Sequence, residues 1–381
     1  YIKGEYAKAV EEFNKALSYN PKYEKARQYL SRSYYQLNQM DKYREEREKA
    51  TELKISDEEE KAEEHYKLGY EFYSLNNYDV AIEELKKALN LKSNHPGARF
   101  LLGECHFKKE EYQLAQLEYE RVINDLEKNE YTDDALLGSG WCLYLLGEYQ
   151  QATEKFLTLI NEFPESSLVL QATYKLSKSY FKIKDYSKTI KVCKEFLEKY
   201  PKFQGPEIEE IYFWLGQSYL ALEHYQEAEE TFARLSSLYP DSPLVKEVKY
   251  SRSLSLFKLE RYQEAIKILE ELMAAEGEGE GRTKDEAHYL LARCWLNLAK
   301  YEQAIKNLED LKYNHQTESS LLEKVIFDLG LAYSRKGDKE KAVLEFQEFI
   351  EKYPQSELID SAHFELGKVL FNLKEYKLAL S

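Results

Sequence analysis

The sequence is short of residues that interrupt regular structure and of long apolar runs. Its 381 residues include only 15 Gly and 8 Pro. Few Gly and Pro disfavour β-sandwiches, barrels and disordered linkers, and they favour long helices joined by short turns. No apolar run reaches the roughly 18 residues that a membrane-spanning helix requires, so we expect no direct membrane insertion.

Charge and cysteine content exclude further classes of protein. Asp and Glu total 69 against 54 Lys and Arg, which gives a net charge of −15 and disfavours nucleic acid as a partner. The four Cys, at positions 105, 142, 193 and 294, lack the CxxC spacing of a redox site or a zinc knuckle.

Motifs of catalysis and metal binding are also missing. There is no Gly-rich phosphate loop, no Gly-x-Ser-x-Gly elbow and no His-Glu-x-x-His pair. Three of the seven His (His65, His288 and His363) share one position in the repeat described below, which indicates packed or half-exposed structural residues rather than metal ligands. We therefore predict no enzyme activity in this segment, no cofactor and no metal site.

What the sequence does have is an internal repeat of 34 to 39 residues. The tripeptide Gly4-Glu5-Tyr6 returns as Gly147-Glu148-Tyr149, and its Tyr is the anchor of each repeat. The anchors are Tyr6, Met40, Tyr78, Tyr112, Tyr149, Tyr186, Tyr225, Tyr262, Tyr301, Lys339 and Tyr376. Ala usually follows three residues after the anchor, Gly often precedes it by nine, and Pro often follows after fifteen. The pattern predicts two helices per repeat, joined by a tight turn.

Each recurring position has a physical role in such a repeat. A small residue nine before the anchor, such as Gly140, lets two helix backbones approach closely, and a large residue seven after it, such as Phe156, fills the space between repeats. Pro ends the second helix because it cannot donate an interior hydrogen bond, so all eight Pro are expected in loops between repeats. Cys105, Cys142 and Cys294 share the position seven before the anchor, where we expect small buried side chains.

This pattern resembles the tetratricopeptide repeats. The family's pattern is matched at Leu329-Gly330, Tyr333, Gly337, Ala342, Phe346 and Pro354. Most repeats exceed the family's usual length of about 34 residues, and the surplus lies between repeats, as in Tyr353-Pro354-Gln355-Ser356. That Tyr-Pro-x-Ser signature resembles the bacterial cell-envelope branch of the family, found in outer-membrane assembly lipoproteins and the Tol-Pal coordinator. The resemblance implies an all-α, right-handed α-solenoid of tandem helix-turn-helix repeats.

We expect one continuous array over residues 1–381, without internal domain boundaries. It comprises a half repeat at 1–23, nine full repeats at about 24–354 and a partial repeat at 355–381. Because no polar capping repeat is visible at either end, we expect the chain to be a segment of a longer protein.

The best candidate for a binding surface is an aromatic stripe on the first helices. Tyr or Phe recurs twelve and five residues before the anchor, and these positions share one helix face. In tetratricopeptide repeats that face lines a groove for peptides or partner helices. Between them, eight before the anchor, the residue varies, as expected of a surface that selects a partner. The candidate groove residues are Tyr66, Tyr70, Tyr73, Phe107, Trp141, Tyr144, Lys178, Phe181, Gln217, Tyr250, Tyr289, Arg293 and Lys368.

An alternative stays open for this stripe, because aromatic residues at the two outer positions also pack successive first helices together. We expect several of them, near Tyr66 to Tyr73 and Trp141 to Tyr144, to be exposed in the groove. The central position carries less packing, so Trp141 and Arg293 are the better individual candidates.

Together these features predict a non-catalytic scaffold that binds other proteins, as peptide segments or helices, in a larger bacterial assembly. Two alternatives stay open: a periplasmic adaptor for envelope or motility machinery, and the regulatory arm of an enzyme whose catalytic domain lies outside this segment. The resemblance favours the cell envelope, whereas four unpaired Cys favour a reducing compartment, so location stays open. Exposed solenoid ends could also join copies into a homo-oligomer.

Overall fold

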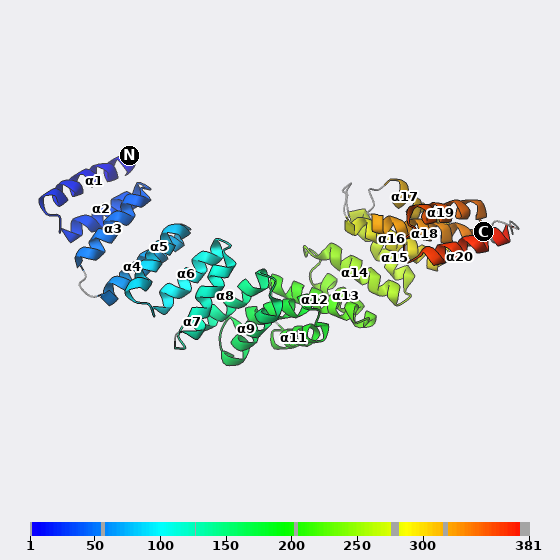
Figure 1. Ribbon diagram of the computed structural model, residues 1–381, viewed down its shortest axis with the longest axis horizontal. Helices are drawn as coiled ribbons and strands as arrows, with labels where there is room; N and C mark the ends of the chain where they lie inside the picture. The colour runs from blue at the N-terminus through cyan, green and yellow to red at the C-terminus, as the bar shows by residue number, and fades with distance from the viewer. Residues whose placement is uncertain are drawn as a thin grey trace. The chain divides into compact units, whose positions relative to one another are not determined.

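The computed structural model describes residues 2–54, 58–125, 127–201, 205–275, 282–314 and 319–373. Within these ranges the chain forms twenty α-helices and no β-strand (Figure 1). Their contacts group them into two compact units, the N-terminal unit (Tyr1–Ile183) and the C-terminal unit (Lys184–Ser381). None of the described helices is long and apolar enough to span a lipid bilayer.

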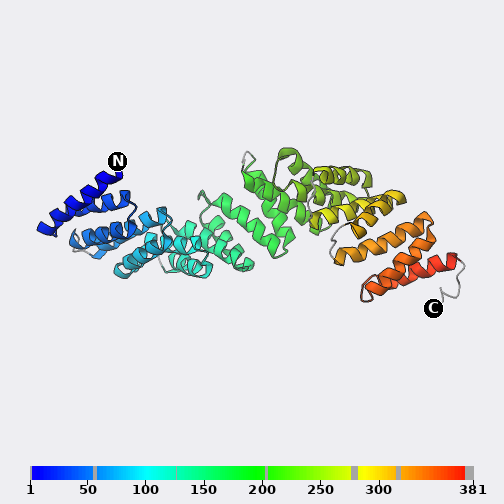
Figure 2. The same ribbon diagram turned by 90° about the horizontal axis from the view of Figure 1, so that it is seen from above.

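The N-terminal unit is a row of helices in which neighbours along the chain pack side by side (Figure 2). Its helices are α1 (Ile2–Tyr19), α2 (Glu24–Gln36), α3 (Met40–Lys54), α4 (Glu58–Ser74), α5 (Tyr78–Leu91), α6 (Pro96–Lys108), α7 (Tyr112–Asn124), α8 (Thr132–Leu145), α9 (Tyr149–Glu162) and α10 (Val169–Lys182).

The C-terminal unit repeats the same arrangement, and each unit is an α-solenoid of tandem helix-turn-helix repeats. Its helices are α11 (Tyr186–Lys199), α12 (Pro206–Ala221), α13 (Tyr225–Leu238), α14 (Val245–Lys258), α15 (Tyr262–Ala275), α16 (Arg282–Asn297), α17 (Tyr301–Tyr313), α18 (Ser319–Lys336), α19 (Lys339–Lys352) and α20 (Ile359–Asn372). Even-numbered helices from α2 onward are the first helices of the repeats, and odd-numbered helices are the second.

The sequence anchors mark where the second helices begin. Each anchor from Met40 to Lys339 is the first residue of an odd-numbered helix. Two residues earlier the backbone turns through a positive φ, which is 83° at Gly147, and the next N–H, of Glu148, donates to the carbonyl of Leu143 at 2.8 Å. The same conformation occurs at Asn38, Asn76, Glu110, Lys184, Glu223, Glu260, Ala299 and Gly337. The predicted pair of helices with a tight turn is confirmed.

Glycine nine residues before the anchor faces the large side chain of its own repeat. A Cβ placed on Gly140 would lie 2.6 Å from Cε1 of Phe156, and one on Gly330 would lie 2.8 Å from Cε1 of Phe346. Both Phe side chains are fully buried. The close helix approach predicted from the small residues is therefore confirmed at these positions.

The Pro-x-Ser loops, which begin with Phe163, Tyr239 and Tyr353, have a structural function that links repeats. Ser166 Oγ donates to Oδ2 of Asp133 at 2.6 Å and accepts from the N–H of Leu168 at 3.1 Å. One hydroxyl thus fixes the turn that leads into α10 and ties it to the start of α8. The same pair of bonds recurs at Ser242 with Glu209 and Leu244, and at Ser356 with Glu323 and Leu358.

Prolines and cysteines largely follow expectation. Pro96 and Pro206 are the first residues of α6 and α12 rather than loop residues, because the first N–H of a helix has no intrahelical partner to lose. The other six Pro lie in loops between repeats. All four Cys are free and buried, as predicted for three of them, and burial raises the pKa of Cys105 to about 12.

The ends of the predicted array are described only in part. The last anchor, Tyr376, and the rest of the segment 374–381 lie outside the described residues. A single continuous array over the whole chain stays a prediction.

Candidate partner-binding groove

The even-numbered helices form the inner face of each unit. The backbones of successive even-numbered helices lie close together from α4 to α10 and from α12 to α20. Those of the odd-numbered helices do not among the described residues, where long side chains such as Lys312 on α17 and Glu345 on α19 join neighbours instead. The even-numbered row is therefore the more tightly spaced one. All thirteen candidate groove residues lie on even-numbered helices, as the sequence predicts.

Exposure varies widely among the candidates of the N-terminal unit. Tyr70 on α4 is 56% exposed, whereas Tyr66 and Tyr73 on the same helix are half-buried. Trp141 on α8 is half-buried, and Tyr144 is only 9% exposed. Several residues of these two stretches were expected to be exposed. Tyr144 is not one of them, and its ring stacks on Trp141 with ring centres 4.8 Å apart.

Three further candidates of this unit are also partly covered. Phe107 is half-buried, and its ring centre lies 5.6 Å from that of Tyr112. Lys178 Nζ lies 5.8 Å from the centre of the Tyr174 ring, and Phe181 is half-buried. Packing therefore accounts for much of the stripe here, as the alternative reading predicts.

In the C-terminal unit, most candidates are engaged with neighbouring side chains. Gln217 donates to Ser251 Oγ at 2.8 Å. The half-buried Tyr250 has its pKa raised to about 12, chiefly by burial. Lys368 is exposed and pairs with Glu365 at 2.8 Å.

Tyr289 and Arg293 share one buried carboxylate on the next even-numbered helix. The hydroxyl of Tyr289 donates to Oδ2 of Asp328 at 2.7 Å, and Nε of Arg293 lies 3.7 Å from the same oxygen. The Arg293 guanidinium also lies 5.0 Å from the ring centre of Phe257 and 5.9 Å from that of Tyr289. An arginine of the chain itself thus sits between aromatic rings and a carboxylate.

A hollow of about 330 Å³ opens on the inner face of the N-terminal unit. We call it the inner hollow, and it is lined by Phe100, Glu104, Phe107, Lys108, Tyr119, Asp134, Leu137, Gly138, Trp141, Gln171 and Lys175. Most of these residues come from the first helices α6, α8 and α10. Two sequence candidates, Phe107 and Trp141, are therefore brought together with residues that sequence reasoning did not select.

Glu104 is the hydrogen-bond centre of the inner hollow. Its Oε1 accepts from the hydroxyl of Tyr119 at 2.5 Å, and its Oε2 accepts from that of Tyr73 at 3.2 Å. Burial, followed by the charge of Glu104, raises the pKa of both tyrosines far above the usual range. The ring of Tyr119 fits closely between Gly103 and Gly138, where a Cβ would approach it to 2.8 and 2.7 Å.

The second carboxylate of the inner hollow, Asp134, lacks such donors. Its side chain is half-buried and accepts no hydrogen bond from the described residues. Burial, and the negative charges of Asp133 and Glu104, raise the pKa of Asp134. Nearby, Nζ of Lys175 lies 3.2 Å from the centre of the Trp141 ring, so this cation is held by the indole.

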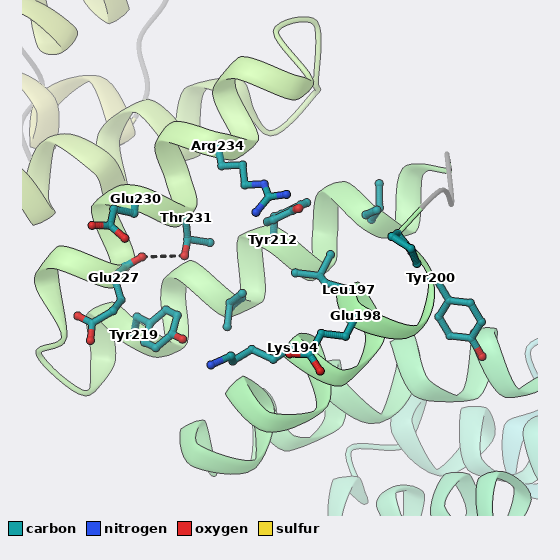
Figure 3. A pocket seen from close by; sticks show the side chains of 13 residues that line it. Lys194, Leu197, Glu198, Tyr200, Tyr212, Tyr219, Glu227, Glu230, Thr231 and Arg234 are labelled. Carbon is teal, nitrogen blue, oxygen red and sulfur yellow. Dashed lines mark hydrogen bonds between the residues drawn. The ribbon is translucent and has the colours of Figure 1, made fainter.

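A second hollow, of about 420 Å³, lies in the C-terminal unit and was not predicted (Figure 3). Its lining includes a stripe on α12 made by Ile208, Tyr212, Leu215 and Tyr219. Charged residues of α11 and α13 flank the stripe, and Arg234 lies 5.6 Å from the ring centre of Tyr212. It contains none of the thirteen candidates.

Metal binding has no structural support in the described ranges. No group of three or more His, Cys, Asp or Glu side chains there could hold a metal ion. Of the three His that share one repeat position, His65 is half-buried with Nδ1 2.8 Å from Glu84, His288 is buried and His363 is exposed.

Comparison with protein families identifies the repeat. Family models described as tetratricopeptide repeat match residues 1–23, 213–280, 256–323 and 324–356. The chain belongs to the tetratricopeptide-repeat family. Within this tetratricopeptide-repeat protein, residues 129–224 match a model described as an outer membrane lipoprotein, and residues 40–121 match one described as subunit 3 of the anaphase-promoting complex, or cyclosome.

Solved structures similar to this tetratricopeptide-repeat protein are distant. A tetratricopeptide repeat protein from Parabacteroides merdae is 20% identical, with 71% of this chain and 98% of that one covered and a TM-score of 0.45. YrrB, titled a TPR protein with an unusual peptide-binding site, is 18% identical over 49% of this chain and 91% of its own, at a TM-score of 0.44. MamA from Desulfovibrio magneticus RS-1 is 21% identical over 49% and 97%, at 0.41. A search of curated proteins finds no match.

Sequence reasoning missed the polar residues of this tetratricopeptide-repeat groove. Asp134 stands fifteen residues before its anchor and Lys175 eleven before, so neither falls on the aromatic positions. Glu104 does occupy the variable central position, eight before its anchor, which was the one available signal.

Proposed function

We propose that this segment is a non-catalytic scaffold that binds extended segments or helices of partner proteins along its even-numbered helices. The observation that carries the proposal is the inner face of the N-terminal unit, where Tyr70 is 56% exposed and the inner hollow opens between the neighbouring first helices. Tyr and Trp are common anchors at protein interfaces because they bury a large area with few rotatable bonds.

The cellular setting is a second part of the proposal. The match of residues 129–224 to an outer membrane lipoprotein model supports a role in a bacterial assembly. An adaptor within the cell envelope is the specific candidate that this match favours. In either setting the repeats would act together as one array, with both inner faces offered to partners.

The test is a comparison of partner capture by groove and control variants. The groove variant carries Tyr70→Ala and Trp141→Ala, and the control carries Tyr19→Ala and Tyr313→Ala, two tyrosines on odd-numbered helices that are 90% and 65% exposed. Each tagged chain is incubated with a lysate of the source organism, cross-linked, and analysed by mass spectrometry.

We expect the wild-type and control chains to cross-link to the same partner and the groove variant to lose it. Circular dichroism must first show equal helicity, because Trp141 also stacks on Tyr144. If all three chains capture the same proteins, the binding surface lies elsewhere and the proposal fails.

A further inference from the structure

We propose that the inner hollow binds one cationic side chain, arginine or lysine, of an extended partner segment. Asp134 would be its ionic partner, and the rings of Phe107 and Trp141 would contact its aliphatic stem. This inference rests on the proposed function, because it names the chemistry of the segment that the inner face recognises.

The unpartnered carboxylate of Asp134 is the first argument. Glu104 uses both of its oxygens on tyrosine hydroxyls, whereas Asp134 accepts no hydrogen bond from the described residues. A half-buried carboxylate without a donor is costly, and its two charged neighbours, Asp133 and Glu104, add repulsion. A cation brought by a partner would relieve both penalties.

The walls of the hollow are the second argument. Its volume of about 330 Å³ falls at the lower end of the range for ligand sites. Aromatic rings from Phe100, Phe107 and Trp141 line it. Long cationic side chains place their methylene stems on apolar surface and keep the charged head near a carboxylate or a ring face.

The third argument is that the chain already contains such an arrangement. In the C-terminal unit the guanidinium of Arg293 lies near the rings of Phe257 and Tyr289, with Nε 3.7 Å from the carboxylate of Asp328. Arg293 stands eight residues before its anchor, and Trp141 occupies the same repeat position in the inner hollow. Both units thus place aromatic rings near a carboxylate, but the carboxylates differ in repeat position. Asp328 stands eleven residues before its anchor, a position held by Lys175 in the N-terminal unit, whereas Asp134 stands fifteen before its anchor.

An anionic ligand is the competing possibility, because Lys108 and Lys175 also line the inner hollow. Lys175 is already engaged with the Trp141 ring and is buried. Lys108 is exposed. The charges that act on Asp134 itself are both negative, and Lys175 is already engaged with the indole, so Asp134 favours a cation.

The experiment uses the full chain labelled with 5-fluorotryptophan, whose three Trp give separate ¹⁹F signals. The signal of Trp141 is assigned with Trp141→Phe. The chain is titrated with N-acetyl-arginine amide and N-acetyl-lysine amide, and with the neutral isostere N-acetyl-citrulline amide and the anionic N-acetyl-glutamate amide. Asp134→Asn is compared with Asp241→Asn, an exposed aspartate of the C-terminal unit.

We expect the two cationic amides to shift the Trp141 signal saturably and the citrulline and glutamate amides to leave it unchanged. Asp134→Asn should weaken binding at least about tenfold, the loss expected for one charge-assisted hydrogen bond, and Asp241→Asn should not. The inference is overturned if citrulline binds as well as arginine, if glutamate binds instead, or if Asp134→Asn binds as tightly as the wild type.

The two proposals fail in different ways. If partner capture depends on Tyr70 and Trp141 but Asp134→Asn binds the arginine amide normally, the groove stands and the cation site does not. If the arginine amide binds through Asp134 while the groove variant still captures every partner, the cation site stands and the proposed scaffold surface does not.

Discussion

In the C-terminal unit, the carboxylate of Asp328 accepts a hydrogen bond from Tyr289 and lies 3.7 Å from Arg293. In the N-terminal unit, Glu104 is similarly bonded to two tyrosines, but the neighbouring Asp134 has no donor among the described residues. The same side-chain types therefore form a satisfied cluster on one inner face and an unsatisfied one on the other.

This difference indicates that the residue eight before the anchor decides whether the chain itself supplies the cation of an inner-face cluster. Arg293 and Trp141 both stand eight residues before their anchors, on helices that pack in the same way. The repeats form the same pair of helices with different side chains at this position, such as Tyr70 on α4, Glu104 on α6, Trp141 on α8 and Arg293 on α16. Selectivity can vary there without disturbing the fold.

The largest expected effect tests whether both units depend on the same close packing between the two helices of a repeat. We predict that Gly140→Ala and Gly330→Ala each lower the free energy of unfolding by about 2 kcal/mol, because the new Cβ would overlap the buried rings of Phe156 and Phe346. Urea unfolding followed by circular dichroism measures the loss.

Gly367 on α20 is the matched control for these two substitutions. No atom of the described residues lies within 4 Å of a Cβ placed on it, so Gly367→Ala should stabilise its helix by about 0.5–1 kcal/mol. If Gly140→Ala lowers the free energy of unfolding no more than Gly367→Ala does, the close approach of the two helices is not required. The two units would then share no packing requirement at this position.

The next effect separates the two carboxylate clusters. We predict that Tyr289→Phe lowers the free energy of unfolding by about 1.5 kcal/mol, since it removes a donor from a buried charged acceptor. Tyr73→Phe should cost about 0.5 kcal/mol, because Glu104 keeps its bond to Tyr119 and the Tyr73 bond is longer.

Tyr29→Phe provides the baseline for both, because Tyr29 is 53% exposed and its hydroxyl makes no hydrogen bond to another described residue. Urea unfolding of the three variants gives the ranking. Equal losses for Tyr289→Phe and Tyr73→Phe would show that the two clusters do not differ in the way the geometry indicates.

Much of the helix arrangement within each repeat could be predicted from the sequence, because it depends on residues that must recur. The anchor begins each second helix, and the Gly–Phe contact repeats, since both follow from the close approach of two helices. The identity of the inner face followed from the same period. Such features are set by steric requirements that every repeat shares.

The candidate site could be predicted only in outline. Trp141 and Phe107 were selected by position, but the burial of Tyr144 was not foreseen, because it depends on the neighbouring indole that covers its ring. Asp134 was missed because its significance depends on which side chains of α6 meet it across the repeat boundary. Contacts between repeats involve residues that do not recur, so the period carries no information about them.

A smaller effect is expected when the cation of the C-terminal cluster is removed, because that cluster then resembles the inner hollow of the N-terminal unit. We predict that Arg293→Ala lowers the free energy of unfolding by about 1 kcal/mol through loss of its ring and carboxylate contacts. Because the variant leaves Asp328 beside the rings of Phe257 and Tyr289, millimolar N-acetyl-arginine amide should raise its unfolding midpoint.

Arg234→Ala distinguishes this rescue from a general effect of the amide. Arg234 also lies over a tyrosine ring, that of Tyr212, but its guanidinium forms no ion pair within the part of the chain that the structure describes. The amide should not rescue it. Equal rescue of both variants would mean that ring contacts alone bind the cation, and the role given to the carboxylates would be wrong.

The smallest effect is a dependence on pH that should differ in sign between two aspartates of the C-terminal unit. Burial raises the pKa of Asp328, although Tyr289, Arg293 and Arg335 oppose the shift. The folded state therefore holds this proton more tightly than the unfolded state does. As the pH falls from neutral through the raised pKa, the stability of the wild type should increase relative to that of Asp328→Asn, which cannot titrate.

Asp185, the N-cap of α11, should behave in the opposite way. Its hydrogen bond from Lys188 lowers its pKa, so its contribution is present above the ordinary aspartate pKa and is lost as the pH falls through the lowered one. Urea midpoints of the wild type, Asp328→Asn and Asp185→Asn, measured from neutral to acidic pH, test the pair. Because differences from the wild type cancel the titration of all other groups, parallel trends for the two variants would show that Asp328 is not held as a buried carboxylate. The hydrogen bond from Tyr289 and the charges of Arg293 and Arg335 would then outweigh burial in setting the pKa of Asp328.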